Sequence, residues 1–248
     1  MKKCSFILHF FLLSGIAFSQ PGDQRAIFHD PQAEARIATG FNAIKVSSGI
    51  DLIIKQGDEE GIAVSASREA FRNMIKTVVK NGVLHIYFED INFDRKNFWK
   101  RDKSNKKLKA YVSVKTLDRL TGSTGANITI NGRIIFDKLM IDLSSGSNFK
   151  GEVHAAQLDV DQSTGATARL NGEAQSLNVE TSTGSGFYGF NLMSDVCNAR
   201  VTSGGFIEIT VNKEMIVKAN TGGGIRYKGN GVIKTISTNT GGSVSKRS

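Results

Sequence analysis

The chain has 248 residues, of which 40% are hydrophobic and 26 are glycine. Its 32 Lys and Arg residues against 23 Asp and Glu residues give a formal net charge of +9 at pH 7. This length suffices for one or two domains with a substantial core. Of the two cysteines, Cys4 lies in a segment typical of an export signal, so Cys197 is left alone and an intramolecular disulfide is excluded.

Residues 1–19 have the pattern of an export signal peptide. Two lysines precede an apolar run over 6–18, and the small residues Ala17 and Ser19 favour cleavage before Gln20. The run is too short for an ordinary transmembrane helix, and no second hydrophobic segment follows it. We therefore expect an exported protein without a transmembrane segment, located in the periplasm, on the outer surface or outside the cell.

Residues 20–35 are predicted to form a flexible leader, because Pro21, Gly22 and Pro31 disfavour regular structure.

Residues 36–116 are predicted to form an N-terminal β cap region. Apolar and polar residues alternate over 41–46, and Asn81-Gly82 between two apolar runs is a strong hairpin signal. This region lacks a regular period, although its segment 47–49, Ser-Ser-Gly, matches a phrase that is repeated later. We expect it to seal the open end of the repeats that follow, where an uncovered strand edge would promote aggregation.

A strongly basic insertion, 91–109, interrupts the cap region between two expected strands. It carries eight Lys and Arg residues against two Asp residues, interleaved with two phenylalanines and the only tryptophan of the chain. Such side chains suit anionic polymers, because charge attracts the polymer and flat rings pack on sugars or bases. The alternative is a solvated hairpin tip. The candidate ligand-binding residues are Arg95, Phe98, Trp99, Lys100, Arg101, Lys106 and Lys107.

From residue 117 to 248 one short phrase recurs about every 19 residues. Each copy has a glycine, a Ser or Thr directly before it, and apolar residues five places before and three places after it. The repeated glycines are Gly125, Gly146, Gly165, Gly184, Gly204, Gly222 and Gly241.

This period, with strand-forming residues and glycine turns, is the signature of a solenoid. Each repeat is too short to bury its own apolar face, so repeats must stack, which places equivalent residues about 4.8 Å apart. The apolar positions then form interior ladders, and the Ser/Thr positions form a hydroxyl ladder able to bond from rung to rung. Asn131-Gly132, Asn171-Gly172 and Lys228-Gly229 mark a second turn. The sequence predicts an all-β, right-handed parallel β-helix-like solenoid of about seven repeats of ~19 residues.

Four residues before the repeat glycines, the acidic residues Asp142, Asp161 and Glu180 should occupy consecutive rungs, followed by Arg200 and Lys218. Carboxylates about 5 Å apart repel unless they are screened, protonated or bridged by a cation. Three interpretations stay open: a solvated surface row, a site for Ca²⁺, which prefers several oxygen ligands, or a catalytic site with Arg200 as the base. Beyond Ca²⁺, no cofactor is expected.

The export signal, the opening Phe41-x-x-Ile44-x-Val46-x-x-Gly49-Ile50-Asp51-Leu52, the strand at 82–86 and the serial Ser/Thr-Gly repeats together resemble the GIN-domain family (DUF2807). That family is described as putative auto-transporter adhesin head domains and is frequent in exported Bacteroidetes proteins. The resemblance covers residue 41 to the C-terminus. It implies an adhesin-like role and brings no catalytic residues.

From these features we expect an exported, non-enzymatic, adhesin-like binding protein of the cell envelope, which contacts anionic polysaccharide or another envelope component through the basic insertion. Nucleic acid is not the expected ligand, because the protein is exported. Two alternatives remain: a lyase-like β-helix enzyme that acts on acidic polysaccharide through the acidic residues, and a structural protein that forms homo-oligomers through its ends or faces.

Overall fold

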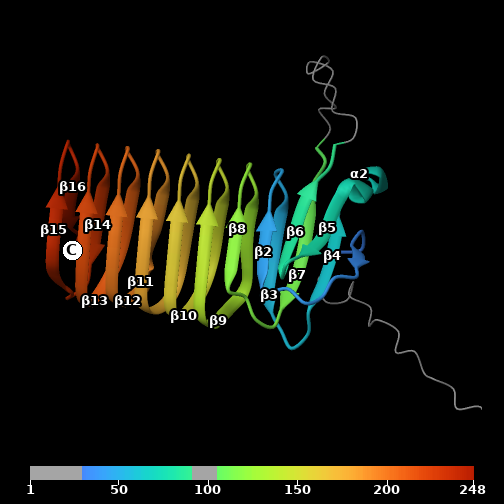
Figure 1. Ribbon diagram of the computed structural model, residues 1–248, viewed down its shortest axis with the longest axis horizontal. Helices are drawn as coiled ribbons and strands as arrows, with labels where there is room; N and C mark the ends of the chain where they lie inside the picture. Colours follow the sequence, from blue (N-terminus) through green and yellow to red (C-terminus); the bar gives the residue numbers. More distant parts are fainter. Residues whose placement is uncertain (1–29, 91–104) are drawn as a thin grey trace, which may run out of the picture.

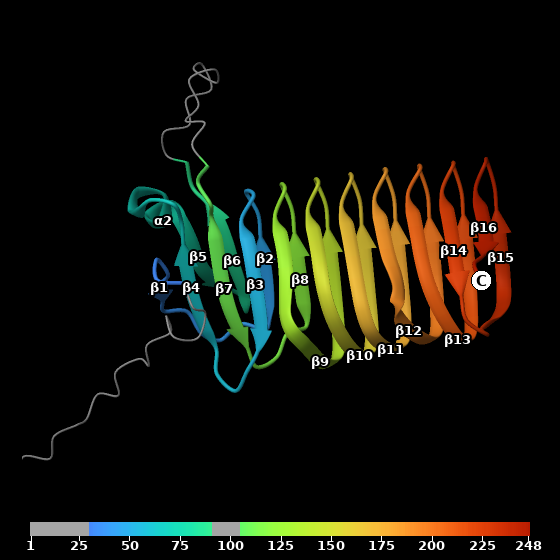
Figure 2. The ribbon, with the colours of Figure 1, turned by 180° about the vertical axis from the view of Figure 1, so that it is seen from behind.

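The repeats stack into one elongated solenoid with its turns aligned along one edge (Figure 1). The computed structural model describes residues 30–90 and 105–248. The view from behind shows the same stack, with the only helix of the described part, α2 (Glu69–Met74), at the N-terminal end (Figure 2). The predicted all-β solenoid is confirmed.

The strands fall into three groups along the chain. Those before the basic insertion are β1 (Glu34–Arg36), β2 (Ala43–Val46), β3 (Asp51–Gln56), β4 (Gly61–Ser65), β5 (Ile75–Lys80) and β6 (Val83–Phe88). The next group is β7 (Lys109–Val114), β8 (Arg119–Gly122), β9 (Asn127–Leu143), β10 (Asn148–Gln162), β11 (Thr167–Thr181) and β12 (Gly186–Val201). The last is β13 (Phe206–Ala219), β14 (Gly224–Lys228), β15 (Val232–Thr238) and β16 (Ser243–Lys246).

The strands of neighbouring repeats pair in parallel, and each residue lies opposite the equivalent residue of the next repeat. This register stacks the apolar residues of all repeats in the core. Phe149, for example, lies opposite Ile128 on one side and Ala168 on the other. All three side chains are at most 1% exposed. Burying one large apolar side chain in such a column stabilises the fold by about 1.5–3 kcal/mol. The predicted interior ladders are therefore confirmed, and Cys197 occupies one of them as a buried core residue whose burial raises the pKa of its thiol to about 12.

Each repeated Ser/Thr-Gly pair forms the two central residues of a tight turn. At the third repeat, Thr164 and Gly165 have φ values of 51° and 70°, and the Ala166 N–H donates to the Ser163 carbonyl over 3.2 Å. Positive φ at both central residues defines a type I′ turn. Backbone groups join successive turns: the Gly165 N–H donates to the Thr183 carbonyl over 3.1 Å. Among the described residues, no hydroxyl of the Ser/Thr positions bonds to the next rung, so the expected hydroxyl ladder is replaced by a backbone ladder.

The second turn predicted at these pairs is a bend within a continuous strand at Asn131-Gly132 in β9 and Asn171-Gly172 in β11, whereas Lys228-Gly229 falls where β14 ends, before β15 begins. Gly172 has a φ of 112°, and the register between β11 and β12 shifts between Arg169 and Asn171. A Cβ atom at Gly172 would lie 2.2 Å from the carbonyl oxygen of Val153 on the preceding rung. Glycine is required here both for its backbone conformation and for the close approach of two strands.

Much of the expected cap region is solenoid. β2 pairs in parallel with β8 on one side and β6 on the other, and β3 likewise lies between β9 and β7. The pairs β2–β3 and β6–β7 therefore add rungs to the same stack (Figure 1). In the chain, 20 residues, 89–108, separate β6 from β7. The Asn81-Gly82 hairpin is confirmed as the link between antiparallel β5 and β6.

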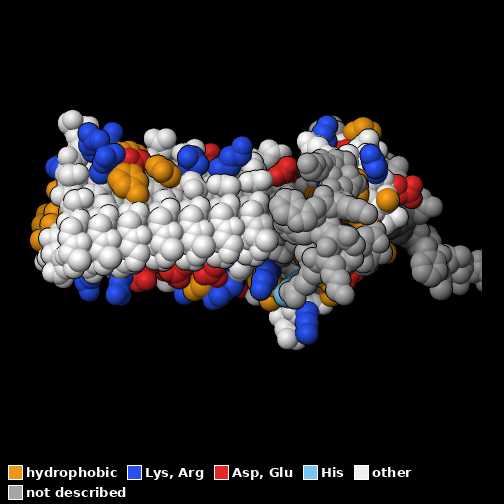
Figure 3. Space-filling view, turned by 90° about the horizontal axis from the view of Figure 1, so that it is seen from above, with side chains coloured by type: hydrophobic (Ala, Val, Ile, Leu, Met, Phe, Trp, Pro, Cys, Tyr) orange, Lys and Arg blue, Asp and Glu red, His pale blue; other side chains and the backbone are white. Residues whose placement is uncertain are grey.

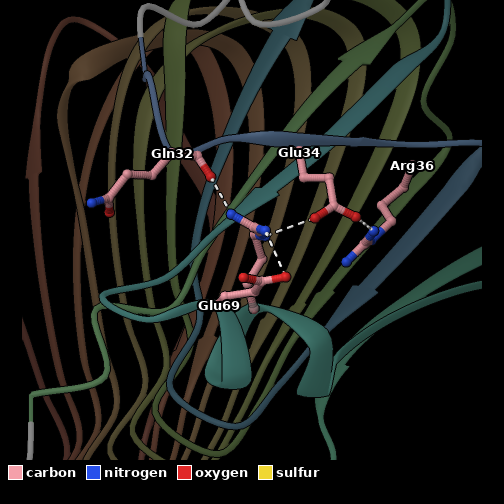
Figure 4. A network of polar contacts seen from close by, with 5 residues as sticks. Gln32, Glu34, Arg36 and Glu69 are labelled. Carbon is pink, nitrogen blue, oxygen red and sulfur yellow. Dashed lines mark hydrogen bonds and ion pairs between the residues drawn. The ribbon is translucent and has the colours of Figure 1, made fainter.

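The cap proper consists of β1, β4, β5 and α2. β1 begins at Glu34, inside the expected leader, and pairs antiparallel with β4. A polar network around Arg72 of α2 holds β1 in place (Figure 4). Arg72 Nε lies 2.8 Å from Glu34, which also pairs with Arg36, while the Arg72 guanidinium donates to the Gln32 carbonyl over 3.3 Å and lies 3.9 Å from Glu69.

The two kinds of glycine should differ in their tolerance of alanine. The Gly165→Ala change adds a Cβ that meets nothing within 4 Å, so only the left-handed backbone costs energy, about 1–2 kcal/mol of unfolding free energy. The Gly172→Ala change adds a backbone clash and should cost about 2–5 kcal/mol in total. Urea unfolding of the two variants and the wild type measures the difference; equal losses would contradict this account of the bend.

Candidate functional site

Most of the predicted ligand-binding residues, namely Arg95, Phe98, Trp99, Lys100 and Arg101, lie outside the described part of the chain. The structure describes the other two, Lys106 and Lys107, whose surroundings differ. Lys106 Nζ lies 3.6 Å from Asp90 and 5.5 Å and 5.1 Å from the ring centroids of Phe71 and Phe88. Lys106 is therefore held at the base of the insertion, whereas Lys107 is exposed.

The acidic residues lie on adjacent rungs as predicted. Asp161 of β10 lies opposite Asp142 of β9 and Glu180 of β11, and we call these three residues the acidic row. Arg119 contacts Asp142 at one end of the row over 3.2 Å. At the other end Arg200 lies opposite Glu180, but the two form no ion pair within the described part of the chain.

Charge repulsion is concentrated at the centre of the acidic row. Partial burial raises the pKa of the Asp161 carboxyl, and the negative charges of Glu180, Asp142 and Asp159 raise it further. The row borders a shallow groove of about 280 Å³ whose other walls are mainly Ser and Thr residues of the turns. In residues 30–90 and 105–248, no group of three or more His, Cys, Asp or Glu side chains converges to hold a metal ion.

A second charged surface lies on the strand segments that follow the turns. Four residues after successive glycines, Lys150, Arg169, Tyr188, Glu208 and Arg226 lie opposite one another in register. Lys150, Arg169 and Tyr188 are exposed. In Figure 3, acidic side chains cluster along the middle of one long side of the solenoid with basic side chains beyond them, and on the other long side basic side chains lie among hydrophobic ones.

Three cation–aromatic pairs lie on this surface. The Arg169 guanidinium lies 4.8 Å from the ring centroid of Tyr188, and Lys228 Nζ lies 4.9 Å from that of Phe190. A third pair joins Arg226 to Phe206 over 4.9 Å, and the rings of Tyr188 and Phe206 are 6.0 Å apart. The residues of this surface, which we call the basic-aromatic face, are Lys150, Arg169, Tyr188, Phe190, Phe206, Arg226 and Lys228.

The basic-aromatic face is concave and its charge is largely uncompensated. Lys150, Arg169 and Lys228 border a concavity of about 730 Å³, and none of them forms an ion pair within the described residues. The carboxylate of Glu208 lies in the same concavity but is 3.8 Å from Arg226. An arginine stacked on a ring keeps its N–H donors in a fixed plane, which suits carboxylate, sulfate or phosphate groups.

The sequence prediction missed this face. Its signal was present in the repeats, because the same alignment that reveals the acidic row also places Lys150 and Arg169 at one position. Tyr188 shares that position, whereas Phe190 and Phe206 lie six and two places after their turn glycines, so their pairing with Lys228 and Arg226 depends on the three-dimensional register.

Comparison with known proteins shows the family of this chain. A family model described as "Putative auto-transporter adhesin, head GIN domain" matches residues 40–231. The chain belongs to the GIN-domain family. No curated protein matches it. Within the described residues of this GIN-domain protein, no helix has both the length and the apolar character to span a membrane.

Solved structures of the same fold come from related bacteria. A putative adhesin from Bacteroides fragilis has a TM-score of 0.77 at 18% identity, covering 87% of this chain and 96% of that one. A putative adhesin from Parabacteroides merdae has a TM-score of 0.65 at 18% identity, with coverages of 87% and 95%. A protein from Parabacteroides distasonis described as a putative lipid binding protein has a TM-score of 0.65 at 16% identity, with coverages of 88% and 98%. At these identities the likeness establishes the shared fold.

The raised pKa of Asp161 gives a test of the acidic row. The Asp161 carboxyl binds a proton more tightly in the folded state than in the unfolded state, so its ionisation destabilises the fold. This destabilisation is complete above the folded pKa and disappears as the pH falls towards the ordinary value of 3.8. The Asp161→Asn change should therefore raise the unfolding free energy at pH 7 by about 0.5 kcal/mol, and the gain should shrink as the pH is lowered towards 4.

Denaturant unfolding over this pH range measures the effect. The matched control is Asp195→Asn, because Asp195 has Lys213 Nζ 2.9 Å away and should gain nothing when its charge is removed. A loss of stability in Asp161→Asn at pH 7 would show that the acidic row is not under repulsion.

Proposed function

We propose that this protein is an exported, non-enzymatic, adhesin-like binding protein of the cell envelope, and that it contacts anionic glycans through the basic-aromatic face. Membership of the GIN-domain family and the names of the structural neighbours support the adhesin-like part of the proposal. The observation that carries the glycan part is the pairing of Arg169 with Tyr188 and of Lys228 with Phe190 around one concavity.

The spacing of the rungs suits a polymer better than a small ion. Lys150 and Arg169 lie on adjacent rungs, about 4.8 Å apart along the stack, and Lys228 lies further along the same concavity. A chain that carries repeated carboxylate or sulfate groups could contact these cations in succession along the solenoid axis. The partly exposed rings beside them offer apolar surface to sugar rings.

The basic insertion is the second contact in this proposal. It lies between β6 and β7 in the chain, and Lys106 in its C-terminal part contacts Asp90 and two phenylalanines. A variant designed to remove charge from the insertion should therefore change Lys100 and Arg101 and leave Lys106 intact.

A binding measurement with polygalacturonate and dextran sulfate tests the proposal, with neutral dextran as the control ligand. Replacing Lys150, Arg169 and Lys228 by Ser should weaken binding at least about tenfold, which corresponds to about 1.4 kcal/mol. The wild-type affinity should fall steeply with salt. The matched control replaces Lys138, Lys213 and Lys234 by Ser, because it removes the same charge from cations that already pair with Asp159, Asp195 and Glu214.

The outcomes separate the competing interpretations. Equal binding by the wild type and the face variant would contradict the proposed site, and loss only in the Lys100→Ser/Arg101→Ser variant would move the site to the insertion. Absence of salt-sensitive binding in the wild type would contradict the glycan proposal altogether. Formation of an unsaturated uronate product from polygalacturonate would contradict the non-enzymatic assignment and favour the lyase-like alternative.

A further inference from the structure

The acidic row and the basic-aromatic face flank the same turns and carry complementary charges. In each rung, one exterior residue lies four places before the turn glycine and another lies four places after it. Before the glycines the order is Asp142, Asp161, Glu180, Arg200 and Lys218. After the same glycines it is Lys150, Arg169, Tyr188, Glu208 and Arg226. The first series therefore changes from negative to positive along the stack, whereas the second changes from positive to negative at Glu208 and is positive again at Arg226.

We propose that the face bearing the acidic row packs against the basic-aromatic face of a second copy of this chain, side by side and parallel, with a stagger of one rung. This interaction goes beyond the proposed glycan binding and does not depend on it. Because each copy in such a pair uses one of its two faces and leaves the other free, the contact is heterologous and extends into an open row of molecules.

The one-rung stagger follows from matching the two series of side chains. In this register Asp161 faces Lys150 of the second copy, and Glu180 faces its Arg169. Next along the stack, Arg200 faces Tyr188 and Lys218 faces Glu208. No two like charges meet among these residues, and every rung of both copies repeats at the same interval of about 4.7–4.9 Å, so the match persists along the stack.

Other arrangements place like charges together. Without the stagger, Lys218 would face Arg226; with a stagger in the opposite direction, Glu180 would face Glu208. An antiparallel arrangement centred on the same rungs would place Asp161 against Glu208 and Arg200 against Arg169. Because juxtaposed like charges oppose association, the charge pattern selects both the direction and the register.

The available area meets the requirement of a specific interface. With a stagger of one rung, six of the seven rungs about 4.8 Å apart face each other, and strand segments of about six residues give an overlap of roughly 29 by 20 Å. Two such faces bury about 1,150 Å² in total, which exceeds the area of about 1,000 Å² expected of a biological interface. The proposed contact would also cover apolar side chains on both faces: Val196 and Ile216, which are 45% and 39% exposed, on one, and Tyr188, which is 37% exposed, on the other.

The electrostatic state of the acidic row supports the same contact. Repulsion and partial burial raise the pKa of Asp161 in the single molecule. A facing Lys150 from a second copy would relieve this repulsion, so association and ionisation of the row should favour each other. A soluble anionic polymer would compete with the acidic row for the same cations.

Sedimentation velocity of the protein tests the proposal over a wide concentration range, at about 20 mM and about 500 mM NaCl, where screening differs strongly. At low salt the mass should rise with concentration beyond that of a dimer, and at high salt it should return to the monomer. Two charge-reversal variants identify the faces: Asp161→Lys/Glu180→Lys on the acidic side and Lys150→Glu/Arg169→Glu on the basic side. Each alone should remain monomeric.

Mixing the two variants distinguishes a specific interface from a folding defect. Each variant keeps one wild-type face, and these two faces are complementary, so an equimolar mixture should associate although neither variant does so alone. Circular dichroism verifies that both variants fold. The Asp161→Lys/Glu180→Lys variant should still bind polygalacturonate if the glycan proposal holds, which keeps failure of one proposal distinct from failure of the other.

Four results would overturn this inference. The first three are a wild-type protein that stays monomeric at every concentration at low salt, variants that associate as the wild type does, and a mixture of folded variants that stays monomeric. Association that requires added polygalacturonate would also overturn it, because the polymer and not the acidic row would then be bridging the molecules.

Discussion

The parallel register of one repeat is the constraint on which the rest of the molecule depends. It is fixed at the turn edge, where a type I′ turn closes each rung and the glycine N–H of one turn bonds to the Ser or Thr carbonyl of the next over 2.9–3.1 Å. Since side chains alternate between the two sides of a strand, a slip of one residue would turn the interior ladders outwards. The turn ladder and the apolar ladders therefore enforce the same register.

The same register converts a one-dimensional pattern into charged surfaces. Residues that are about 19 positions apart in the chain become neighbours about 4.8 Å apart, so a bias at one position of the repeat becomes a row along the solenoid. In the acidic row, partial burial and the neighbouring negative charges together raise the pKa of Asp161, while the row that includes Arg169 combines cations with rings. Each surface results from the stacking and needs no dedicated loop.

The sequence predicts those parts of the structure that repeat. Seven copies share the glycines, the hydroxyl residues before them and the apolar ladders, so these features can be recognised from the sequence. The acidic row follows from the same alignment. The β6–β7 rung could not be recognised, because 20 residues, 89–108, separate its two strands and because Val83 pairs with Ala43, which is distant in the chain. The cation–aromatic pairs also escape prediction, since Lys228 reaches Phe190 across an intervening rung, beside a register shift between β12 and β13.

The central claim is that stacked repeats present a basic-aromatic face that binds acidic glycans. A crystal structure of the protein with an oligogalacturonate tests it most directly. The account predicts carboxylates of the sugar within hydrogen-bonding distance of Lys150 and Arg169, with the oligosaccharide running along the solenoid axis. An oligosaccharide bound instead at the acidic row or at the insertion, with the basic-aromatic face empty, would contradict it.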